Sequence, residues 1–430
     1  MKKCVLISFV LIIISISMAG ADTGPTIGRG YFGSPKPIQE FYDQELLKEI
    51  RNGEDNLLDR FLEGINCLDD TDFFKPTLKK VQEVIRWKAL HREDFRKLAS
   101  RLPQIENLLA RFPKKTDPKT IEFPRDGGRH LDKLVEWWYW NGHLFDEEKR
   151  EYSFEACFFR FGPLIHFAHF AVTDVTGKRF LFERTFFSPL SCVLSENRLE
   201  LKYGDWEIVP VGQDFISIKA QAKDIAIQLL ARSEKPPLLV NQNGYVKMGV
   251  DGYSYYYSQP RWQTTGALRF KERAVKVAGQ SWFDHQWGNF FLSTVLGWDW
   301  FCFKLTDNIH YNIFSFHSLT GAQVNPVATI QYANGTQETT RIVKLEPINW
   351  WTSPHTRRKY PSGYVLTLPE KNSVFTVKPK VIDQELFADP FSPDFIDYWE
   401  GPCTIEGNVA GKPVQGQCFN EICGYPKVAP

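Results

Sequence analysis

The chain has 430 residues, of which 43% are hydrophobic and 15% aromatic. This length and composition predict a sizeable core and about two domains with an additional segment. Lysines and arginines number 52 and aspartates and glutamates 51, which leaves a net charge of +1 without a long basic run. The charge therefore gives no basis for nucleic-acid binding.

The N-terminus has the pattern of an export signal. Two lysines precede an almost wholly apolar run over residues 5–18, and a small-residue cleavage site follows at residues 19–21. The pattern predicts a signal peptide over residues 1–21 and a secreted or periplasmic protein. The apolar run is shorter than the roughly 20 residues of a membrane span, and no later run is long enough, so we expect no transmembrane span.

Two segments of different character follow the signal. Residues 22–37 are rich in Gly, Pro and Thr, which is typical of a linker. Over residues 38–113 apolar residues recur at helical spacing, with breaks near 52–53, 69–70 and 76, so we expect an α-helical segment. We interpret this segment as a helical cap or accessory part, and a partner-binding surface is the alternative.

After a second linker, helical spacing almost disappears and short runs of aromatic and β-branched residues follow at intervals of about ten residues. A first series predicts the strands of an N-terminal β domain over residues 118–290: 137–144, 152–161, 167–173, 179–187, 198–203, 206–210, 215–222 and 225–231. A second series predicts a C-terminal β domain over residues 291–430: 298–305, 310–317, 328–332, 339–345, 364–368, 374–381, 398–407 and 416–423. The fold class is therefore mainly β, and antiparallel barrels or sandwiches are favoured over an α/β fold.

The cysteines leave one question open. One of the eight lies in the predicted signal, so at least one of the remaining seven is free or pairs elsewhere. Cys403 and Cys418 could face each other across a hairpin, with or without a disulfide. No CxxC pair and no recognisable metal spacing of histidines occurs, so we expect no metal site and no cofactor.

Seven of the 13 tryptophans lie in three stretches, residues 136–140, 281–288 and 297–301. Because alternate residues of a strand share a face, these stretches predict three groups of neighbouring side chains: Glu136, Trp138 and Trp140; His285 and Trp287; Trp298 and Trp300. A pocket lined by such rings suits a long apolar ligand. Tyr257, in a tyrosine-rich run, lines the mouth of this pocket or belongs to a buried strand.

One mechanism fits these residue types. A carboxylic acid kept protonated by burial can protonate an isolated carbon–carbon double bond, aromatic faces can stabilise the carbocation, and a histidine can take a proton from the attacking water. The candidate catalytic residues are Asp284, His285, Trp287, Asp299 and Tyr311. The candidate ligand-binding residues are Glu136, Trp138, Trp140, Tyr257, Trp298 and Trp300. The alternative, which the residue types by themselves favour, is a buried structural pair of Asp284 and His285 with the tryptophans in the core.

Several motifs occur in order between about residue 120 and residue 426: Phe123-Pro124-x-Asp126 with His130; Glu136-Trp137-Trp138-Tyr139-Trp140-Asn141-Gly142-His143-Leu144; Tyr257-Ser258-x-Pro260; Gly279-x-x-Trp282-x-Asp284-His285-Gln286-Trp287-Gly288; Gly297-Trp298-Asp299-Trp300-Phe301; Tyr398-Trp399-Glu400-Gly401; and Glu421-x-x-Gly424-Tyr425. In this order they resemble the AttH/CrtC group, which includes the carotenoid 1,2-hydratases, also called hydroxyneurosporene synthases. The helical segment lies outside the resemblance.

The resemblance implies two lipocalin-like β-barrels packed side by side, with a ligand pocket in the first barrel or at their junction. It implies His285 and Trp287 as candidate catalytic positions, and Tyr311 more loosely. The hydratases of the group carry an acid just after that tyrosine, where this chain has Asn312. The resemblance therefore bears on the fold more firmly than on the reaction.

Two functions remain from the sequence. The first is an exported hydratase or isomerase, a lyase similar to carotenoid 1,2-hydratase, which acts by acid/base catalysis on an apolar isoprenoid or lipid-like substrate. The second is a non-catalytic, lipocalin-like carrier of a hydrophobic ligand. The sequence leaves the substrate and the oligomeric state open.

Overall fold

The computed structural model describes residues 119–162, 165–248, 252–290, 297–317, 323–387 and 397–428. The signal peptide, the linker and the helical segment predicted ahead of residue 114 lie outside the described residues. Most described residues belong to antiparallel strands, with short 3₁₀ helices at η1 (Arg125–Gly127), η2 (Pro189–Ser191) and η4 (Pro369–Lys371). Within these ranges no helix has the length and apolar character needed to cross a membrane.

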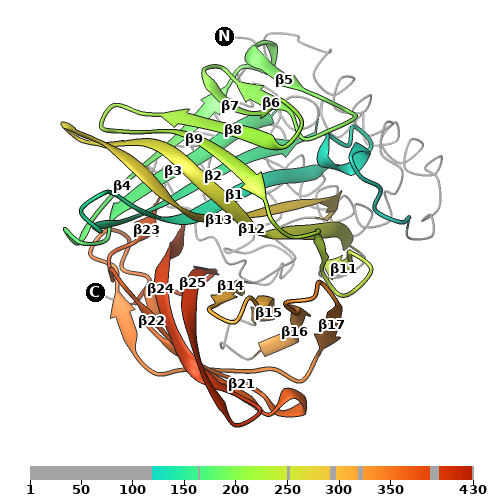
Figure 1. The fold of residues 1–430 in the computed structure, drawn as a ribbon, viewed down its shortest axis with the longest axis vertical. Coiled ribbons are helices and arrows are strands. Elements are labelled where there is room, and N and C mark those ends of the chain that lie inside the picture. The colour runs from blue at the N-terminus through green and yellow to red at the C-terminus, as the bar shows by residue number, and fades with distance from the viewer. Residues whose placement is uncertain are drawn as a thin grey trace, which may run out of the picture.

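The first sheet runs in the order β4-β3-β2-β1-β13-β12-β9-β8-β7-β6-β5, and β10 and β11 pair with β12. Its ends meet, because Phe187 of β4 packs on Tyr203 of β6 with ring centroids 5.6 Å apart, so the sheet forms a nearly closed barrel (Figure 1). The strands are β1 (Val135–Phe145), β2 (Glu151–Phe161), β3 (Ile165–Asp174), β4 (Arg179–Phe187), β5 (Cys192–Leu194), β6 (Leu201–Tyr203), β7 (Trp206–Val211), β8 (Phe215–Gln221), β9 (Ile225–Ser233), β10 (Leu238–Leu239), β11 (Tyr245–Met248), β12 (Gly252–Phe270) and β13 (Arg273–Asn289).

The second sheet runs in the order β17-β16-β15-β14-β25-β24-β22-β21-β18, with β23 paired to β24, and β19 and β20 form a separate ribbon. It curves into a half-barrel beside the first sheet (Figure 1). The strands are β14 (Trp298–Leu305), β15 (His310–His317), β16 (Gln323–Gln331), β17 (Gln337–Thr340), β18 (Lys344–Pro347), β19 (Trp350–Thr352), β20 (Lys359–Pro361), β21 (Tyr364–Leu368), β22 (Ser373–Pro379), β23 (Glu385–Leu386), β24 (Tyr398–Val409) and β25 (Lys412–Cys423). The predicted mainly β fold with two lipocalin-like barrels is confirmed.

Burial explains where the strands differ. Strand β9 alternates buried and more exposed residues, as expected when only one face packs on a core. Strands β1 and β3 are buried almost throughout, because their inner faces fill the first barrel and their outer faces pack against the second sheet. Among the described residues, one hydrophobic core lies inside each barrel and two clusters lie between the barrels, the larger of which contains Tyr139, Trp282 and Trp300.

Cys403 and Cys418 lie on the two strands of the hairpin formed by β24 and β25. The two residues are directly paired across these strands, as the hairpin interpretation predicted. Both thiols are buried and free. The pairing geometry is thus present without a disulfide.

Candidate functional site

A cavity lies between the two barrels, against the outer face of the first sheet. Its volume is about 110 Å³, counted as the space that the centre of a water-sized molecule can occupy, and it is partly open to solvent. Its walls are formed by β1, β2, β3, β11, β12 and β13 of the first barrel and by β14, β15, β24 and β25 of the second. The lining is mostly aromatic, with a smaller set of polar groups: Trp137, Tyr139, Phe159, Tyr256, Trp298, Trp300, Phe314, Phe316 and Tyr398; Glu155, His169, Asp284, Gln286, Glu400 and Glu421; and Cys157, Val246 and Met248.

Strand alternation decides which side chains reach this cavity. On β13, Asp284 points out of the first barrel into the cavity, whereas its neighbours His285 and Trp287 belong to the barrel interior. On β14, Trp298 and Trp300 both point toward the first barrel and line the cavity, so they share a face as predicted. The cavity is therefore built from the outward faces of strands whose other faces fill the barrels.

Asp284 is the centre of a buried hydrogen-bond network in the cavity wall. Tyr256 donates to its Oδ2 at 2.6 Å, and Trp282 Nε1 donates to its Oδ1 at 2.7 Å. The Tyr256 hydroxyl in turn accepts from Trp300 Nε1 at 2.9 Å and from Asn312 Nδ2 at 2.8 Å. Burial raises the pKa of Asp284 to about 7, because these hydrogen bonds compensate only partly for the lost hydration of the carboxylate.

Three glutamates add further carboxyl groups to the cavity. Glu400 on β24 and Glu421 on β25 are direct cross-strand partners, and Glu155 comes from β2. Burial raises the pKa of Glu155 to about 8 and that of Glu421 to about 7, and it raises the pKa of Glu400 well above its ordinary value. The charge of Glu421 raises the pKa of Glu155 further. Tyr139 donates to Glu400, and Trp298 Nε1 donates to Glu421 at 2.9 Å.

Glu155 has one carboxyl oxygen that is buried without a hydrogen-bond partner among the described residues. Tyr398 donates to its Oε1 at 3.4 Å, and His169 Nδ1 lies 2.6 Å from the same tyrosine hydroxyl. The other oxygen, Oε2, is buried and has no hydrogen-bond partner among the described residues. Buried polar atoms rarely lack a partner. A protonated Glu155 therefore has an O–H that no described residue accepts.

The carboxyl groups of the cavity have little counter-charge: Arg184 lowers the pKa of Glu155, but burial and the charge of Glu421 outweigh it. Among the described residues that line it, none is lysine or arginine. Near neutral pH the carboxyl groups are therefore divided between protonated and ionised forms. An acid that keeps its proton at this pH can donate it to a bound molecule, and aromatic faces stabilise developing positive charge. The arrangement suits proton transfer to an apolar substrate.

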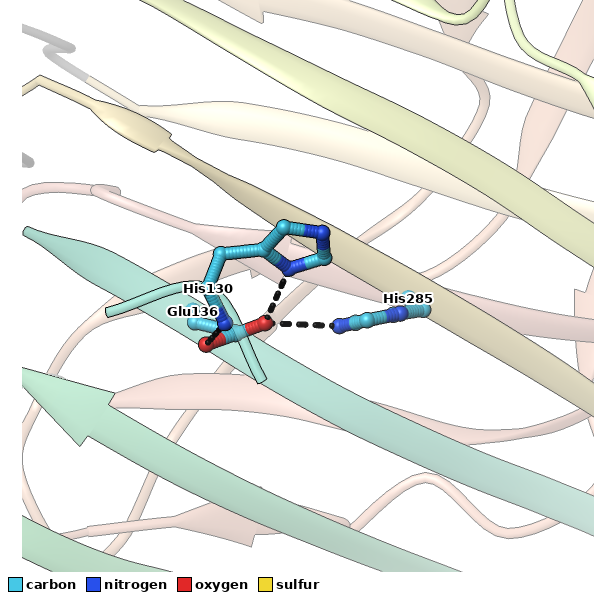
Figure 2. Close-up of side chains that lie close together, drawn as sticks. All are labelled: His130, Glu136 and His285. Carbon is cyan, nitrogen blue, oxygen red and sulfur yellow. Dashed lines mark hydrogen bonds and ion pairs between the residues drawn. The ribbon is translucent and has the colours of Figure 1, made fainter. Parts of the chain in front are cut away.

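A second polar cluster lies inside the first barrel, and Figure 2 shows its three central side chains. Oε1 of Glu136, on β1, lies 2.8 Å from Nδ1 of His130 and 3.0 Å from Nε2 of His285, on β13. The other carboxylate oxygen accepts from Arg160 Nε at 3.0 Å and from the His130 backbone N–H at 3.0 Å. All four side chains are buried. One carboxylate oxygen is thus shared by two imidazoles.

The surroundings of this cluster give its members different ionisation. Burial opposes the charge of Glu136, but Arg160 and His130 outweigh it and hold the pKa of Glu136 well below its ordinary value. Burial likewise opposes the charge of His130, but Glu136 and Asp126 raise the pKa of His130 overall. Burial lowers the pKa of His285. The cluster therefore holds a carboxylate beside two histidines in a buried interior.

The predicted site residues lie in three separate places. The inter-barrel cavity holds one group: Asp284, Trp298 and Trp300. The interior of the first barrel holds the largest group: Glu136, Trp138, Trp140, Tyr257, His285 and Trp287. The interior of the second barrel holds the last group: Asp299 and Tyr311. The cavity and the two interiors are separated by the sheets themselves.

Asp284 and His285 do not form a pair, although they are adjacent in the chain. Successive residues of a strand point to opposite faces, so Asp284 bonds to Tyr256 and Trp282 outside the barrel. His285 meets Glu136 inside the barrel. The alternative of a structural pair between the two therefore does not hold, and they cannot share one proton-transfer step directly.

Asp299 and Tyr311 are both turned away from the cavity. Asp299 accepts hydrogen bonds from Tyr364 at 2.8 Å and from Tyr425 at 2.9 Å, and burial raises its pKa. Tyr311 packs on Phe303 within the core of the second barrel. These surroundings assign Asp299 and Tyr311 to the hydrogen bonding and packing of that barrel.

Sequence reasoning did not assign Glu155, Glu400 or Glu421 to a site. One signal was available, because each is an acidic residue within a predicted strand that is otherwise rich in apolar residues. A glutamate at a buried strand position is costly unless it is partnered or functional. What the pattern lacks is the partner strand, since the three residues come from strands far apart in the chain.

Comparisons with known proteins agree with this architecture. Residues 114–425 match the AttH-like family. Among solved structures, a protein assigned to AttH from Nitrosomonas europaea is 26% identical with a TM-score of 0.65, over 72% of this chain and 99% of that one. Kievitone hydratase from Nectria haematococca is 18% identical with a TM-score of 0.60, over 72% of this chain and 94% of that one. The comparison with curated proteins found no match. Because the family match covers well over half of its length, the chain belongs to the AttH-like family.

Proposed function

We propose that the protein is a hydratase or isomerase that protonates a carbon–carbon double bond of an apolar, isoprenoid-like or lipid-like molecule in the inter-barrel cavity. The observation that carries this proposal is the combination of an aromatic lining with carboxyl groups whose pKa values lie near neutrality. Such acids are protonated often enough to donate and ionised often enough to accept. A structural neighbour with the same fold bears the name kievitone hydratase, so the fold can house hydration chemistry.

Glu155 is the proposed proton donor. Its pKa of about 8 keeps it protonated at neutral pH, and its Oε2 has no hydrogen-bond partner among the described residues. Asp284 is the proposed base, because Tyr256 and Trp282 donate to both of its oxygens and so favour its ionised form relative to Glu155. Pairs of carboxyl groups with different environments commonly divide acid and base roles in this way.

Hydration of the double bond would proceed by two proton transfers. Glu155 transfers its proton to one alkene carbon, and the positive charge develops on the other carbon. The indole faces of Trp298 and Trp300 line the cavity and stabilise that charge. Water attacks the cation and gives its surplus proton to Asp284, so the alkene and water become an alcohol. Loss of a carbon-bound proton from the cation to Asp284 would instead give an isomerised alkene.

Three features bear on the substrate. The lining is mostly aromatic, which suits an apolar body rather than a charged one. Asn312 stands where the resembling carotenoid hydratases have an acid, but its amide lies in the same hydrogen-bond network as Asp284. A carboxyl group is thus available nearby from another strand. The export pattern at residues 1–21 supports the further proposal that the protein acts outside the cytoplasm.

A carrier of a hydrophobic ligand is the second candidate. The observation that favours it is that the carboxyl groups are largely protonated below neutral pH, which makes the cavity close to uncharged there. A carrier needs the same apolar lining but no proton transfer. Carrier and enzyme therefore differ in turnover and not in binding.

The test uses deuterium oxide as solvent. Isoprenoid and polyene ligands that bind the wild-type protein are incubated with it, and carbon-bound deuterium in the recovered ligand is measured by mass spectrometry. Glu155→Gln should lower deuterium incorporation on the order of 100-fold or more while ligand affinity changes little. Glu183→Gln, on strand β4 and not among the cavity-lining residues, is the control and should leave both unchanged. Binding without deuterium incorporation by any ligand would support the carrier instead.

A further inference from the structure

We propose that His130, Glu136 and His285 form a binding site for one divalent transition-metal ion, with zinc as the best-suited ion. This site lies inside the first barrel and is distinct from the inter-barrel cavity. The three ligand atoms lie within 4.8 Å of one another, and all three residues are buried (Figure 2). Among the residues that the structure describes, no other group of three His, Cys, Asp or Glu side chains has its possible ligand atoms this close together.

Two of the three distances between the ligand atoms are close to those of a metal centre. Oε1 of Glu136 is 2.8 Å from Nδ1 of His130 and 3.0 Å from Nε2 of His285. In a tetrahedral zinc site with bonds of about 2.0 Å, neighbouring ligand atoms are separated by roughly 3.3 Å. The carboxylate oxygen would have to move away from each imidazole by a few tenths of an ångström. The two imidazole nitrogens, up to 4.8 Å apart, would have to approach each other by about 1.5 Å, which rotation of the two side chains must supply.

Each histidine is already oriented as a metal ligand by a hydrogen bond at its other ring nitrogen. Nε2 of His130 lies 3.1 Å from Oδ1 of Asp126, and Nδ1 of His285 lies 3.0 Å from the backbone carbonyl oxygen of Asp126. Metal-bound histidines almost always donate their second N–H to a carboxylate or a backbone carbonyl. One residue, Asp126, supplies both partners here, and both inward-facing nitrogens lie within 3.0 Å of Oε1 of Glu136.

Glu136 is held for binding through a single oxygen. Its Oε2 accepts from Arg160 Nε at 3.0 Å and from the His130 backbone N–H at 3.0 Å, which leaves Oε1 for the metal. The two imidazole nitrogens face this one oxygen, so each contact needs a proton or a cation between the two atoms. A divalent ion has the same charge as two protons, so one ion can replace the protons of both nitrogen–oxygen contacts.

The donor set indicates the class of metal. Two imidazoles and one carboxylate suit zinc and its first-row neighbours, whereas magnesium and calcium prefer oxygen ligands. Three protein ligands also leave a position for water, as zinc sites can. The ion would join η1 and the following residues to β1 and β13, because Asp126 and His130 lie at the start of the barrel and Glu136 and His285 on those strands. We therefore assign it a stabilising role.

The direct test is metal content and binding. The full chain is purified without a histidine tag in metal-free buffer, and zinc chloride is titrated against a chelating indicator dye. We expect one zinc per chain and a rise in the thermal midpoint of about 5 °C at saturating zinc, with little effect of magnesium. Substoichiometric zinc together with an unchanged midpoint would overturn the proposal.

Two variants and a control locate the ion. Asp126→Asn keeps all three ligands and the backbone carbonyl that orients His285, but it weakens the orientation of His130, so zinc affinity should fall about 10–100-fold. His285→Gln removes a ligand and should abolish stoichiometric binding. His143→Gln is the matched control, because His143 is a buried histidine bonded to Glu151 at 3.0 Å, and the pair belongs to no group of three ligands among the described residues.

If a variant fails to fold, a measurement on the wild-type protein can still test the proposed zinc site. X-ray absorption at the zinc edge of the wild-type protein then reports the ligands directly. Two imidazoles and one oxygen ligand from the protein would support the site. Thiolate ligation, or zinc binding that persists unchanged in His285→Gln, would place the metal elsewhere and refute the assignment.

Discussion

The pKa of Asp284 leads to a prediction about stability as a function of pH. In the folded protein burial raises this pKa to about 7, against an ordinary value of 3.8. Between these two pH values the unfolded chain has lost the proton that the folded protein retains. Folding then takes up a proton, so the contribution of Asp284 to stability is fully present below pH 3.8 and is lost as the pH rises to about 7.

The size of the effect follows from this interval. Each pH unit between the two pKa values lowers the free energy of unfolding by about 1.4 kcal/mol. From pH 5 to pH 7 the loss is on the order of 3 kcal/mol, and above pH 7 the contribution stays constant. Asp284→Asn has no proton to lose, so this component of the pH dependence disappears in the variant. The substitution adds a constant offset, because the amide donates where the carboxylate accepted from Tyr256.

The assay is urea-induced unfolding followed by tryptophan fluorescence at pH values from 5 to 8. The difference between wild type and Asp284→Asn cancels most of the pH dependence of the other carboxyl groups. We expect the variant to gain about 3 kcal/mol relative to wild type between pH 5 and pH 8. Asp307→Asn, at an exposed position in a turn of the second barrel, is the control and should follow wild type. Parallel curves for Asp284→Asn and wild type would show that Asp284 is ionised in the fold, and the acid–base reasoning for the cavity would fail.

Three further predictions concern neighbouring contacts. Trp282→Phe removes the 2.7 Å hydrogen bond to Asp284, so the pKa of Asp284 should rise further and the loss of stability should extend to higher pH in the same unfolding series. Arg160→Met leaves the buried carboxylate of Glu136 without its cation and should lower the free energy of unfolding by about 3–5 kcal/mol; a loss below about 1 kcal/mol would contradict this account. Gly288→Ala places a Cβ 2.1 Å from a backbone carbonyl oxygen of β12 and should cost about 3 kcal/mol, measured as a shift in the urea midpoint.

Much of the fold could be predicted from the sequence, because the relevant signals are local. Apolar alternation with turn residues between the runs located most strands, such as β14 and β15, whose predicted bounds match the observed ones. The same alternation sorted Trp138 with Trp140 and Trp298 with Trp300 onto common faces. The alternation along a strand can be recognised from the sequence alone, because the face on which a side chain lies depends only on its position along that strand.

The candidate site could be predicted only in part. Alternation shows that Asp284 and His285 point in opposite directions, but it does not say which direction leads to a cavity. The carboxyl groups of Glu155, Glu400 and Glu421 come together because β2, β24 and β25 meet across the two sheets. No local sequence pattern predicts that these three strands come together.

The sequence by itself therefore determined the β class, the approximate strand positions and the faces that the tryptophans share. Only the tertiary structure decided that the predicted residues divide among a cavity and two barrel interiors. It also brought Oε1 of Glu136 and Nε2 of His285 within 3.0 Å of each other, although the two residues are 149 positions apart in the chain. The physical reason is that strand pairing and sheet packing are long-range: they depend on which buried surfaces fit together, and no single stretch of sequence contains that information.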